Sequence, residues 1–465
     1  MEKRERPEIT STQRFIFLAS LFIIILAIFN APPLAIVSTN PGKPVNAVAK
    51  NVLQSSSDHQ QAKPSLRELK MQEVQSIAQE YMQALLKPQY SVVWSLLHPQ
   101  IQAKWPNEKA FATFLQNRFK EYTLQSYITG SVHELRFWVD PETMIQYTRL
   151  EEIPVSLQLF PKVASFQGAP LPPEDLHPSQ LFQNLPIIMQ YSSNQDGKGG
   201  NWFILNGGPA DLEAPILPPM APVNKIIQVP ILMYHHITPF ISAYPASNYF
   251  RRWVVPPENF NLQMDYLKMH NYHTITFNQL FDAMYYGGPL PSKPIILTFD
   301  DGDADQYQYA YPILWAHHFS AMFYIISGWV GQADSMTWSQ LGEMLVHGMQ
   351  IGSHTVHHYD LASWLNISEQ VVQQELQLSQ LTLEKNLGIA IQQFCYPYGD
   401  PFNRGNWFQR QKIMTMLAAD GYVGATTAFG MTGSIQGSMY PLALLRIPVY
   451  GNEWFQGFVA SLPWN

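Results

Sequence analysis

The sequence predicts an α/β fold: a distorted (β/α) barrel, preceded by a smaller α+β domain and an N-terminal membrane segment. Residues 229–465 alternate short apolar stretches with amphipathic ones, whereas residues 66–207 place helical periodicity before strand-like alternation. Basic residues stand before an apolar run within residues 1–37. Polar or Pro-rich stretches without periodicity, 38–65 and 208–228, predict a disordered tether and a linker between these parts.

The composition is that of a globular chain rather than of a nucleic-acid-binding one. Hydrophobic residues make up 46% of the 465 residues, which is enough for more than one core. Lys and Arg number 28 against 35 Asp and Glu, so the net charge is −7 and no excess of positive charge exists for phosphate groups. The single cysteine, Cys395, cannot form an intrachain disulfide. We therefore expect no nucleic-acid partner.

The N-terminus has the pattern of an export signal. Lys3, Arg4, Arg6 and Arg14 precede an uncharged, largely apolar stretch over residues 15–37. Positive charge before such a run keeps the N-terminus inside and sends the remainder of the chain outside. We expect a single-pass membrane anchor, and a cleaved signal peptide of a secreted protein remains the alternative.

Residues 66–207 begin with helical periodicity and continue with strand-like alternation. The first helical face consists of Val74, Ile77, Ala78, Tyr81 and Leu85. Pro88 ends this helix, and a second one is expected over residues 108–119. Strands are expected at 135–139, 155–159 and 202–205. Helices first and strands afterwards predict an α+β unit, and this order resembles the cone-shaped domains of the nuclear-transport-factor-2-like (NTF2-like) superfamily. Its role, whether binding or spacing, stays open.

From residue 229 onward, short apolar strands alternate with helices. The expected strands are 229–233, 295–299, 320–326, 349–352, 393–395 and 423–426. The expected helices are 260–270, 338–347, 368–387 and 408–420. This alternation predicts a parallel sheet, and so many units predict closure into a barrel. In such folds the reactive groups lie on loops at the carboxyl ends of the strands.

Two adjacent carboxylates, Asp300 and Asp301, follow the apolar strand that ends at Phe299. Neighbouring negative charges raise one another's pKa, and a cation resolves their repulsion. Side chains of consecutive residues at a strand end diverge, so each carboxylate can serve a different purpose. An Asp-Asp-Gly turn in solvent is the alternative interpretation.

A histidine cluster follows the strand at 349–352. His354 and His358 lie four residues apart and can share one metal ion, whereas His357 points away and is given no role. With one Asp they would form a three-ligand site that leaves a position open for water. The third cluster, Tyr396 to Gly399, is a turn that can present a backbone N–H to a developing oxyanion.

Taken together and in order, these clusters resemble the motifs of the polysaccharide deacetylase family, also called the NodB-homology or carbohydrate esterase 4 family. The resemblance runs from about residue 229 to 447. Its motifs are Leu232-Met233-Tyr234-His235, residues 297–302, residues 352–358 with Leu361, and Tyr396 to Gly399. The early Tyr-His and the late Leu-Arg-Ile-Pro-Val resemble the branch that deacetylates poly-N-acetylglucosamine.

The resemblance implies a role for each matching residue. Asp301, His354 and His358 would bind a divalent metal, with zinc expected and cobalt, nickel or iron also compatible. Asp300 would be the general base, and Tyr398 would offer its backbone N–H to the tetrahedral intermediate.

The general acid and the partner of the base depart from the common family pattern. Many members use a late His as the acid, but Arg446 stands in that place and cannot serve as one. The poly-N-acetylglucosamine branch implies His235 instead. Cys395 stands where many members carry an Arg that orients the base.

The sequence thus predicts a metal-dependent hydrolase that removes N-acetyl groups from an extracellular N-acetylglucosamine polymer and needs no organic cofactor. Its partners would be the polysaccharide and, through the N-terminal segment, the membrane. Two alternatives remain: a catalytically silent glycan- or wall-binding protein on the same scaffold, and an O-acetyl esterase acting on a xylan-like polymer.

Overall fold

A computed structural model describes residues 65–464, apart from residues 163–164, 167–168, 171–179, 194–199, 220–222, 240–248, 429–431 and 454. The chain divides into Met1–Lys63 and Pro64–Asn465. The predicted membrane segment and almost all of the tether lie outside the described residues. Within the described ranges, no helix combines the length and the apolar character that crossing a membrane requires.

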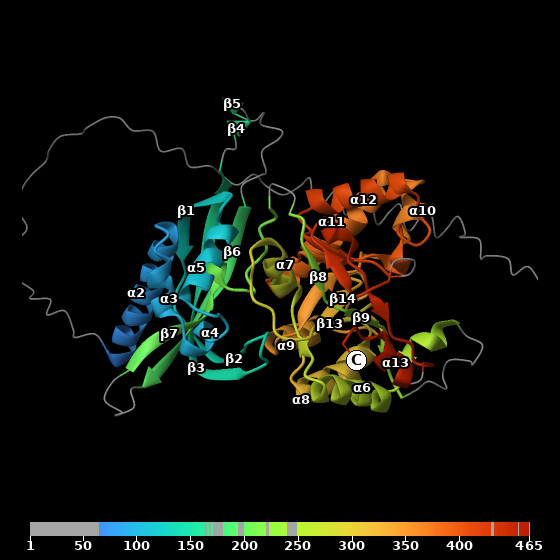
Figure 1. The fold of residues 1–465 in the computed structure, drawn as a ribbon, viewed down its shortest axis with the longest axis horizontal. Coiled ribbons are helices and arrows are strands. Elements are labelled where there is room, and N and C mark those ends of the chain that lie inside the picture. Colours follow the sequence, from blue (N-terminus) through green and yellow to red (C-terminus); the bar gives the residue numbers. More distant parts are fainter. Residues whose placement is uncertain are drawn as a thin grey trace, which may run out of the picture. The chain divides into compact units, whose positions relative to one another are not determined.

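Helices come first in the α+β part and cover an antiparallel sheet (Figure 1). The helices are α2 (Leu66–Leu86), α3 (Tyr90–Leu96), α4 (Pro99–Gln102) and α5 (Glu108–Arg118). The strands are β1 (Tyr122–Thr129), β2 (His133–Val139), β3 (Gln146–Pro161), β6 (Gln180–Ser193) and β7 (Gly200–Gly207).

The five strands form one sheet in the order β1-β3-β6-β7, with β2 also paired to β3. Helix α2 begins with a capping box at Ser65, whose side chain accepts a hydrogen bond from the Glu68 N–H, and it ends just before Pro88 as the sequence predicts. Its apolar stripe packs against the sheet, with Val74, Ala78 and Tyr81 fully buried and Ile77 partly buried. The predicted α+β order is therefore observed, and the likeness to the NTF2-like superfamily stays a prediction.

The second part contains an eight-stranded sheet in which every strand pair is parallel. Its order is β17-β16-β15-β14-β13-β9-β19, and β12 also pairs with β13. The strands are β9 (Ile231–Tyr234), β12 (His273–Thr274), β13 (Pro294–Phe299), β14 (Met322–Ile325), β15 (Gln350–Ser353), β16 (Gln393–Cys395), β17 (Gly424–Thr426) and β19 (Ile447–Pro448).

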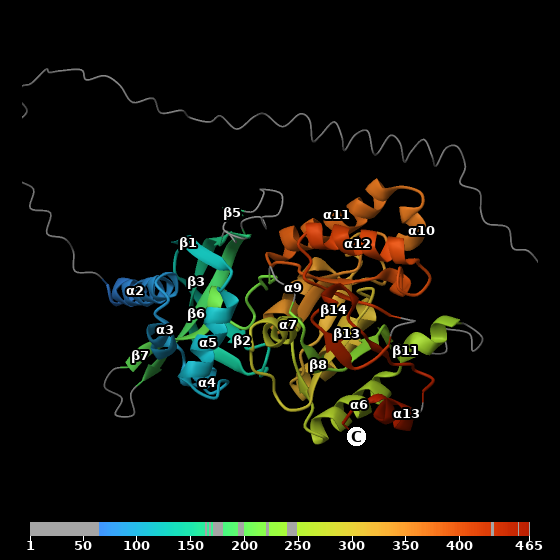
Figure 2. The ribbon, with the colours of Figure 1, turned by 45° about the horizontal axis from the view of Figure 1, so that its top comes forward.

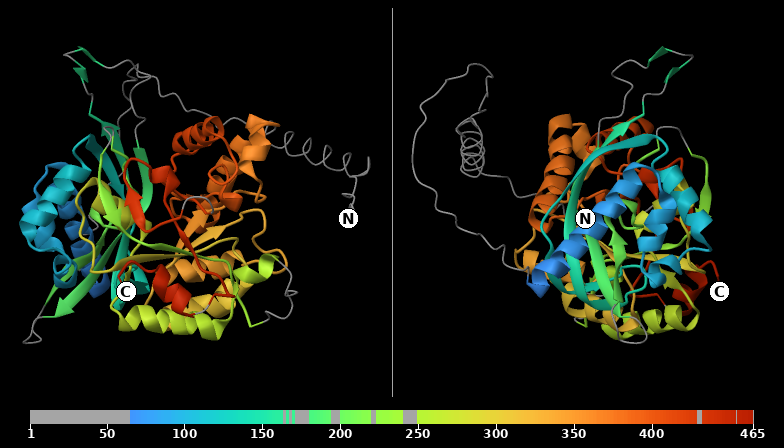
Figure 3. Two further views of the ribbon diagram at one scale, coloured as in Figure 1. Left: turned by 45° about the vertical axis from the view of Figure 1, so that its right-hand side comes forward. Right: turned by 90° about the vertical axis from the view of Figure 1, so that its left-hand side faces the viewer.

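Helices flank this sheet on two sides. They are α6 (Pro257–Met269), α7 (Phe277–Tyr285), α8 (Tyr311–His317), α9 (Trp338–Val346), α10 (Leu361–Leu365), α11 (Glu369–Leu387), α12 (Trp407–Ala419) and α13 (Phe455–Ser461). Figures 2 and 3 show α10, α11 and α12 on one side of the strands and α6 with α13 on the other.

Short elements complete the fold. They are the strands β4 (Ser165–Phe166), β5 (Ala169–Pro170), β8 (Ile226–Gln228), β10 (His236–Ile237), β11 (Val254–Val255) and β18 (Ile435–Gly437), the 3₁₀ turns η2 (Gly208–Ala210), η4 (Tyr249–Trp253), η6 (Pro397–Gly399) and η7 (Pro441–Ala443), and one π-helical turn, η5 (Gln306–Ala310).

A late segment joins the two edges of the parallel sheet. Leu444 forms a parallel bridge with Thr426 on β17, and three residues later Ile447 pairs with Leu232 on β9. The sheet is thus curled toward closure, which confirms the predicted distorted barrel for this part of the chain. Arg446 lies inside the closing segment and is fully buried.

Burial on both faces explains why the barrel strands are continuous apolar runs. All six residues of β13 are buried, and Phe299 stacks on Phe323 of β14 with ring centroids 4.8 Å apart. Because parallel strands end at the same edge, the loops after β9, β13, β15 and β16 converge there. These loops carry the three clusters singled out in the sequence, together with His235.

The α+β part and the barrel share one deeply buried ion pair. Arg118 at the end of α5 donates from Nη1 to Asp282 Oδ1 of α7 at 2.6 Å, and both side chains are essentially inaccessible to solvent. Arg118 Nη2 also donates to the carbonyl oxygens of Ala214 and Pro215 in the connecting segment. A buried guanidinium and carboxylate are tolerated only when paired in this way, so α5, α7 and the linker are tied to one geometry.

Candidate metal centre and active site

Asp300 is held by an arginine from a distant part of the chain. Arg446 donates from Nη1 to Asp300 Oδ1 at 2.7 Å and from Nη2 to Oδ2 at 2.8 Å, a bidentate pair with both residues buried. Burial alone would raise the pKa of Asp300, but the Arg446 guanidinium outweighs it and holds that pKa below its usual value. Asp300 is therefore ionised at neutral pH and fixed in orientation.

Asp301, the next residue, faces two imidazoles instead. Its Oδ1 lies 3.4 Å from His354 Nε2 and 3.4 Å from His358 Nε2. This oxygen is buried and has no hydrogen-bond partner among the described residues. Burial favours a raised pKa for Asp301, yet contact with the two histidines lowers it below the usual range. One carboxylate and two imidazole nitrogens converge on a common point, which is the donor set of a three-ligand metal site.

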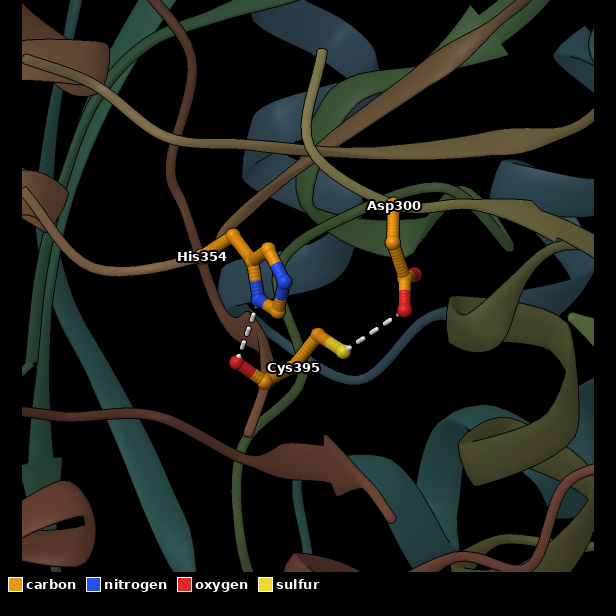
Figure 4. Close-up of side chains that lie close together, drawn as sticks. All are labelled: Asp300, His354 and Cys395. Atoms are coloured by element: carbon orange, nitrogen blue, oxygen red, sulfur yellow. Dashed lines mark hydrogen bonds between the residues drawn. The ribbon is translucent and has the colours of Figure 1, made fainter. Parts of the chain in front are cut away.

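The backbone aims His354 at this point. His354 Nδ1 lies 2.8 Å from the carbonyl oxygen of Cys395 on the neighbouring strand (Figure 4). The other ring nitrogen, Nε2, is thereby left to face Asp301 Oδ1. Such a bond fixes the proton on Nδ1 and leaves Nε2 with a lone pair that can bind a metal. Burial is the main cause that lowers the pKa of His358 to about 4, and the nearby His354 is the second. His358 is therefore neutral at pH 7, as a metal ligand must be.

Several residues of the site adopt a strained backbone conformation. Asp301, Thr355, His358 and Tyr398 have φ values of 81°, 67°, 58° and 59°, in the left-handed region that favours glycine. Each such residue costs about 1–3 kcal/mol and persists only when its surroundings enforce it. Their gathering in the loops after β13, β15 and β16 marks this edge of the barrel as a functional site.

The histidine loop is held from behind by a buried carboxylate. Glu375 of α11 accepts hydrogen bonds at Oε2 from the N–H groups of Val356 at 3.0 Å and His357 at 2.8 Å, and its Oε1 lies 2.6 Å from His357 Nδ1. His357 therefore points away from Asp301, as the sequence predicts. Glu375 fixes the turn that carries both metal-facing histidines, and no local sequence pattern links it to them.

His235 approaches Asp300 from the end of β9. Its Nε2 lies 3.9 Å from Asp300 Oδ2, and its ring packs on Trp253 with centroids 4.5 Å apart. Its Nδ1 is buried without a hydrogen-bond partner among the described residues. Burial lowers the pKa of His235, which makes its protonated form a stronger acid than free histidine. The side chain of Gln306, in the π-helical turn η5, donates to the carbonyl oxygens of both His235 and Asp300.

Tyr398 lies in η6, directly after β16. Its left-handed φ of 59° turns the chain sharply, and its ring lies 4.5 Å from the ring of His358. Burial is the main cause that raises the pKa of its phenol, so the hydroxyl stays protonated at neutral pH. The structure thus brings all six residues predicted from the sequence to one edge of the barrel.

Arg446 supplies Asp300 with the guanidinium that position 395, a cysteine here, does not provide. The Cys395 Sγ lies 3.5 Å from Asp300 Oδ2 and 3.1 Å from Arg446 Nη2, so position 395 adjoins the carboxylate that an arginine there would orient. Figure 4 shows this thiol turned toward Asp300. Here the closing segment supplies the guanidinium instead. One signal was present in the sequence, because an arginine within an apolar stretch is rarely buried without a carboxylate partner.

Two other groups of potential metal ligands each hold a basic side chain against their carboxylates. Asp300, His354 and Cys395 lie close together, but Arg446 occupies both oxygens of Asp300. His236, Asp303 and Asp305 form the second group. In it the imidazole itself stands between the carboxylates, with Nδ1 3.0 Å from Asp305 Oδ2 and 3.3 Å from Asp303 Oδ2. Among the groups found in the described part of the chain, the Asp301 group is the one that joins one carboxylate to two imidazoles.

The family profile named "Polysaccharide deacetylase" matches residues 287–416. The chain is 30% identical over 243 residues to YxkH of Bacillus subtilis (strain 168), a candidate polysaccharide deacetylase; the match covers 51% of this chain and 78% of YxkH. It is 28% identical over 173 residues to a poly-beta-1,6-N-acetyl-D-glucosamine N-deacetylase of Staphylococcus aureus, covering 34% of this chain and 59% of that protein.

Solved structures are also similar. The Streptococcus pyogenes deacetylase PplD in complex with acetate is 29% identical, with a TM-score of 0.44, over 52% of this chain and 99% of that one. IcaB from Ammonifex degensii is 25% identical, with a TM-score of 0.42, over 50% of this chain and 97% of that one. On the sequence matches, the chain belongs to the polysaccharide deacetylase family, whose members are hydrolases of amide bonds.

Proposed function

We propose that this protein is a metal-dependent N-deacetylase of an extracellular N-acetylglucosamine polymer. The observation that carries the proposal is that two adjacent aspartates have different partners. Asp301 Oδ1 lies 3.4 Å from the Nε2 atoms of two histidines. Asp300 instead accepts two hydrogen bonds from the Arg446 guanidinium, at 2.7 and 2.8 Å. One carboxylate is thus placed to bind a cation and the other to remain an ionised base beside it.

The residues fit a divalent metal. Asp301, His354 and His358 would hold it, and a cation would satisfy the buried Asp301 Oδ1, which has no hydrogen-bond partner among the described residues. An oxygen and two imidazole nitrogens suit zinc, which we propose first, and also cobalt, nickel or iron. When bound, a divalent cation polarises the amide carbonyl and lowers the pKa of a nearby water toward about 7.

Asp300 supplies the general base. Arg446 keeps its carboxylate ionised and fixed, so it accepts the proton of the attacking water without rearranging. The water oxygen forms a bond to the acetyl carbon, and the carbonyl oxygen gains negative charge. The backbone N–H of Tyr398, in its turn after β16, stabilises that charge.

His235 completes the reaction on the amine side. Its Nε2 lies 3.9 Å from Asp300 Oδ2, so it borders the same space as the base. Protonated His235 donates to the departing nitrogen as the carbon–nitrogen bond breaks, and acetate and a free amino sugar are released. Trp253 fixes the imidazole plane, and Gln306 ties the backbone of His235 to that of Asp300.

The proposed substrate and the proposed extracellular location are supported by features of the sequence. The S. aureus relative is a poly-beta-1,6-N-acetyl-D-glucosamine N-deacetylase by name, and this supports an N-acetylglucosamine polymer as the substrate. The basic and apolar residues 1–37 support a membrane anchor with the catalytic part outside the cell. Residues 229–465 form the deacetylase domain in this proposal, and residues 66–207 a separate NTF2-like domain.

The decisive experiment compares Asp300→Asn with Asp265→Asn. Asp265 carries a half-exposed carboxylate paired with His317 on α8, away from the metal-facing loops. We expect Asp300→Asn to bind zinc normally and to release acetate from N-acetylglucosamine oligomers at most at about one hundredth of the native rate. Asp265→Asn should be as active as the native protein. Full activity of Asp300→Asn would refute its assignment as the base.

The alternatives are separable in the same assay. Two departures favour a catalytically silent glycan-binding protein, namely the missing arginine at position 395 and the open identity of the general acid. Arg446 supplies a guanidinium in place of the first. The same attack on a carbonyl carbon also cleaves esters. An O-acetyl esterase would therefore be recognised by faster acetate release from acetylxylan than from N-acetylglucosamine oligomers. A higher kcat/KM on acetylxylan would overturn the proposed substrate.

A further inference from the structure

A large cavity lies at the end of the barrel opposite the metal-facing loops. Its volume is about 740 Å³, within the range of about 300–1,000 Å³ that small-molecule sites occupy. Met322, Gln350 and Gln393 line it, and they are the first residues of β14, β15 and β16. His354 comes four residues after Gln350, so the strand places the cavity about 13 Å from the metal-facing side chains. The cavity is therefore separate from the catalytic edge.

Two different parts of the chain form the walls of this cavity. One wall comes from β2, β3 and β6 of the α+β part. The other comes from the barrel strands and the ends of α9 and α11, and residues 213–215 of the connecting segment complete the lining. The cavity thus exists only where the α+β part and the barrel meet.

Close contacts hold the two walls in one arrangement. Phe137 of β2 stacks on His347, directly after α9, with ring centroids 5.4 Å apart. Gly348 follows with a φ of 80°, and a Cβ there would lie 3.1 Å from Met144 Sδ, so glycine permits this close approach. The buried ion pair between α5 and α7 adds a second tie between the walls. The cavity is therefore formed before any ligand arrives.

The ionisable side chains of the lining are all acidic. They are Glu152, Glu213 and Glu384, and no Lys, Arg or His lines the cavity among the described residues. Glu213 accepts a hydrogen bond from the Thr276 hydroxyl at 2.9 Å, so its charge is already partly satisfied. Glu152 on β3 and Glu384 on α11 face the cavity from the two opposing walls, and both are partly buried.

The surroundings of these two carboxylates favour a cation. Burial is the main cause that raises the pKa of Glu152, with a smaller opposite effect of His133. Burial likewise raises the pKa of Glu384, although its Oε1 accepts a hydrogen bond from the Ile391 N–H at 3.0 Å. A positive charge nearby stabilises the ionised form of a carboxylate, and a negative charge opposes it. A cationic ligand is thus complementary to the cavity, whereas an anionic one is not.

A sugar chain that carries amino groups matches this lining. Its ammonium groups would pair with the two carboxylates, and its hydroxyl groups with the exposed carboxamides of Gln183 and Asn184 on β6. Its C–H faces would cover apolar lining such as Trp138 on β2. An acetylated chain carries no positive charge, so the same cavity distinguishes a deacetylated stretch from an acetylated one.

We propose that this cavity binds a deacetylated, amine-bearing stretch of the polymer. The inference rests on the proposed function, which creates the amino groups, and deepens it by giving the product a binding site of its own. Glu152 and Glu384 recognise the ammonium groups and take no part in bond breaking. The protein therefore stays bound to a polymer that is already partly deacetylated, while the catalytic edge remains open to acetylated sugars.

The test is calorimetry with a glucosamine pentamer and an N-acetylglucosamine pentamer. The protein is zinc-loaded Asp300→Asn, in which the acetyl groups stay intact during the titration. We expect the glucosamine pentamer to bind about tenfold more tightly than the acetylated one. Glu384→Gln in this background should abolish the preference, since glutamine still accepts the Ile391 N–H but carries no charge. Ala390→Trp, at an exposed position of the lining, should block both pentamers from the cavity.

Two further variants control the measurement. Glu152→Gln removes the charge from the facing wall and should weaken binding of the glucosamine pentamer independently of Glu384. Glu369→Gln removes an exposed carboxylate at the other end of α11, where it pairs with Lys412 outside the cavity lining. Glu369→Gln should bind both pentamers as its parent does.

Acetate release by the otherwise native protein is measured in parallel, so that the two proposals fail separately. Weaker glucosamine-pentamer binding in Glu384→Gln and Ala390→Trp, with no acetate release, upholds the cavity and refutes the deacetylase. Acetate release with equal affinity for the two pentamers, or with unchanged affinity in both variants, refutes the cavity alone. An equal loss in Glu369→Gln also refutes it, because the effect would then be one of overall charge. A dimer that dissociates in Ala390→Trp would show that a second copy of this chain occupies the cavity and would overturn the proposal.

Discussion

Removing the guanidinium of Arg446 should shift the pH dependence of the reaction. In Arg446→Leu the Asp300 carboxylate stays buried but loses a bidentate partner at 2.7 and 2.8 Å. Burial, which Arg446 now outweighs, then raises the pKa of Asp300. The base becomes protonated at a pH where the native base is ionised, so activity falls at neutral pH and recovers as pH rises.

The size of the effect follows from the buried pair. Breaking a buried ion pair from one side typically costs about 3–5 kcal/mol, because the remaining charge is uncompensated. Since about 1.4 kcal/mol corresponds to a tenfold change in an equilibrium constant, we expect the acid limb of the kcat/KM profile to move up by about 2–4 pH units. The native pair lowers the pKa of Asp300, so its stabilisation is present above the unfolded pKa of about 4 and is lost as pH falls through the folded value.

The assay is the pH profile of kcat/KM for acetate release by zinc-loaded protein between pH 5 and 9. Native protein should show no decline from Asp300 on the acid side of this range, whereas Arg446→Leu should lose activity as pH falls toward 5. Arg446→Lys keeps a charge but loses the bidentate geometry, so it should fall between the two and serves if the leucine variant fails to fold. A native-like profile in both folded variants would refute the role given to Arg446.

Three further predictions concern the metal, its supporting shell and the domain contact. Chelation should abolish acetate release and lower the thermal midpoint, with zinc restoring both; turnover in excess chelator would contradict the metal site. Glu375→Leu leaves the Val356 and His357 N–H groups unpaired, so zinc affinity by competition titration should fall about 10–100-fold, and native affinity would speak against this support. Arg118→Met should lower the free energy of unfolding by about 3–5 kcal/mol in urea denaturation, and adding Asp282→Leu should recover part of that loss; a neutral single variant would show that the pair is not essential.

Sequence patterns identified the barrel because its strands are buried on both faces. β13 is a nearly continuous apolar run, and β15 and β16 are short, largely buried strands of mixed composition; each is followed by residues that form the site. Parallel strands end at one edge, so a linear pattern was enough to place Asp301 near His354. In the α+β part, β1 and β6 were missed because their half-exposed residues give no clean apolar alternation.

What the sequence could not give are contacts between distant residues. Arg446 and Asp300 are 146 positions apart, and Glu375 is 18 positions from His357 on a different element. No local period links such residues, since their pairing depends on how the barrel closes. The π-helical turn η5 that directs Gln306 to two carbonyl oxygens is equally invisible, because its residues fit an ordinary helix.

The central claim is that Asp301, His354 and His358 hold one divalent cation beside an arginine-bound base. The most direct test is a crystal structure of zinc-loaded protein with anomalous data collected at the zinc edge. We predict one strong peak about 2.0–2.2 Å from an Asp301 oxygen and from Nε2 of both histidines, with Asp300 outside the ligand sphere. No peak there, or a peak only between His236, Asp303 and Asp305, would contradict the account.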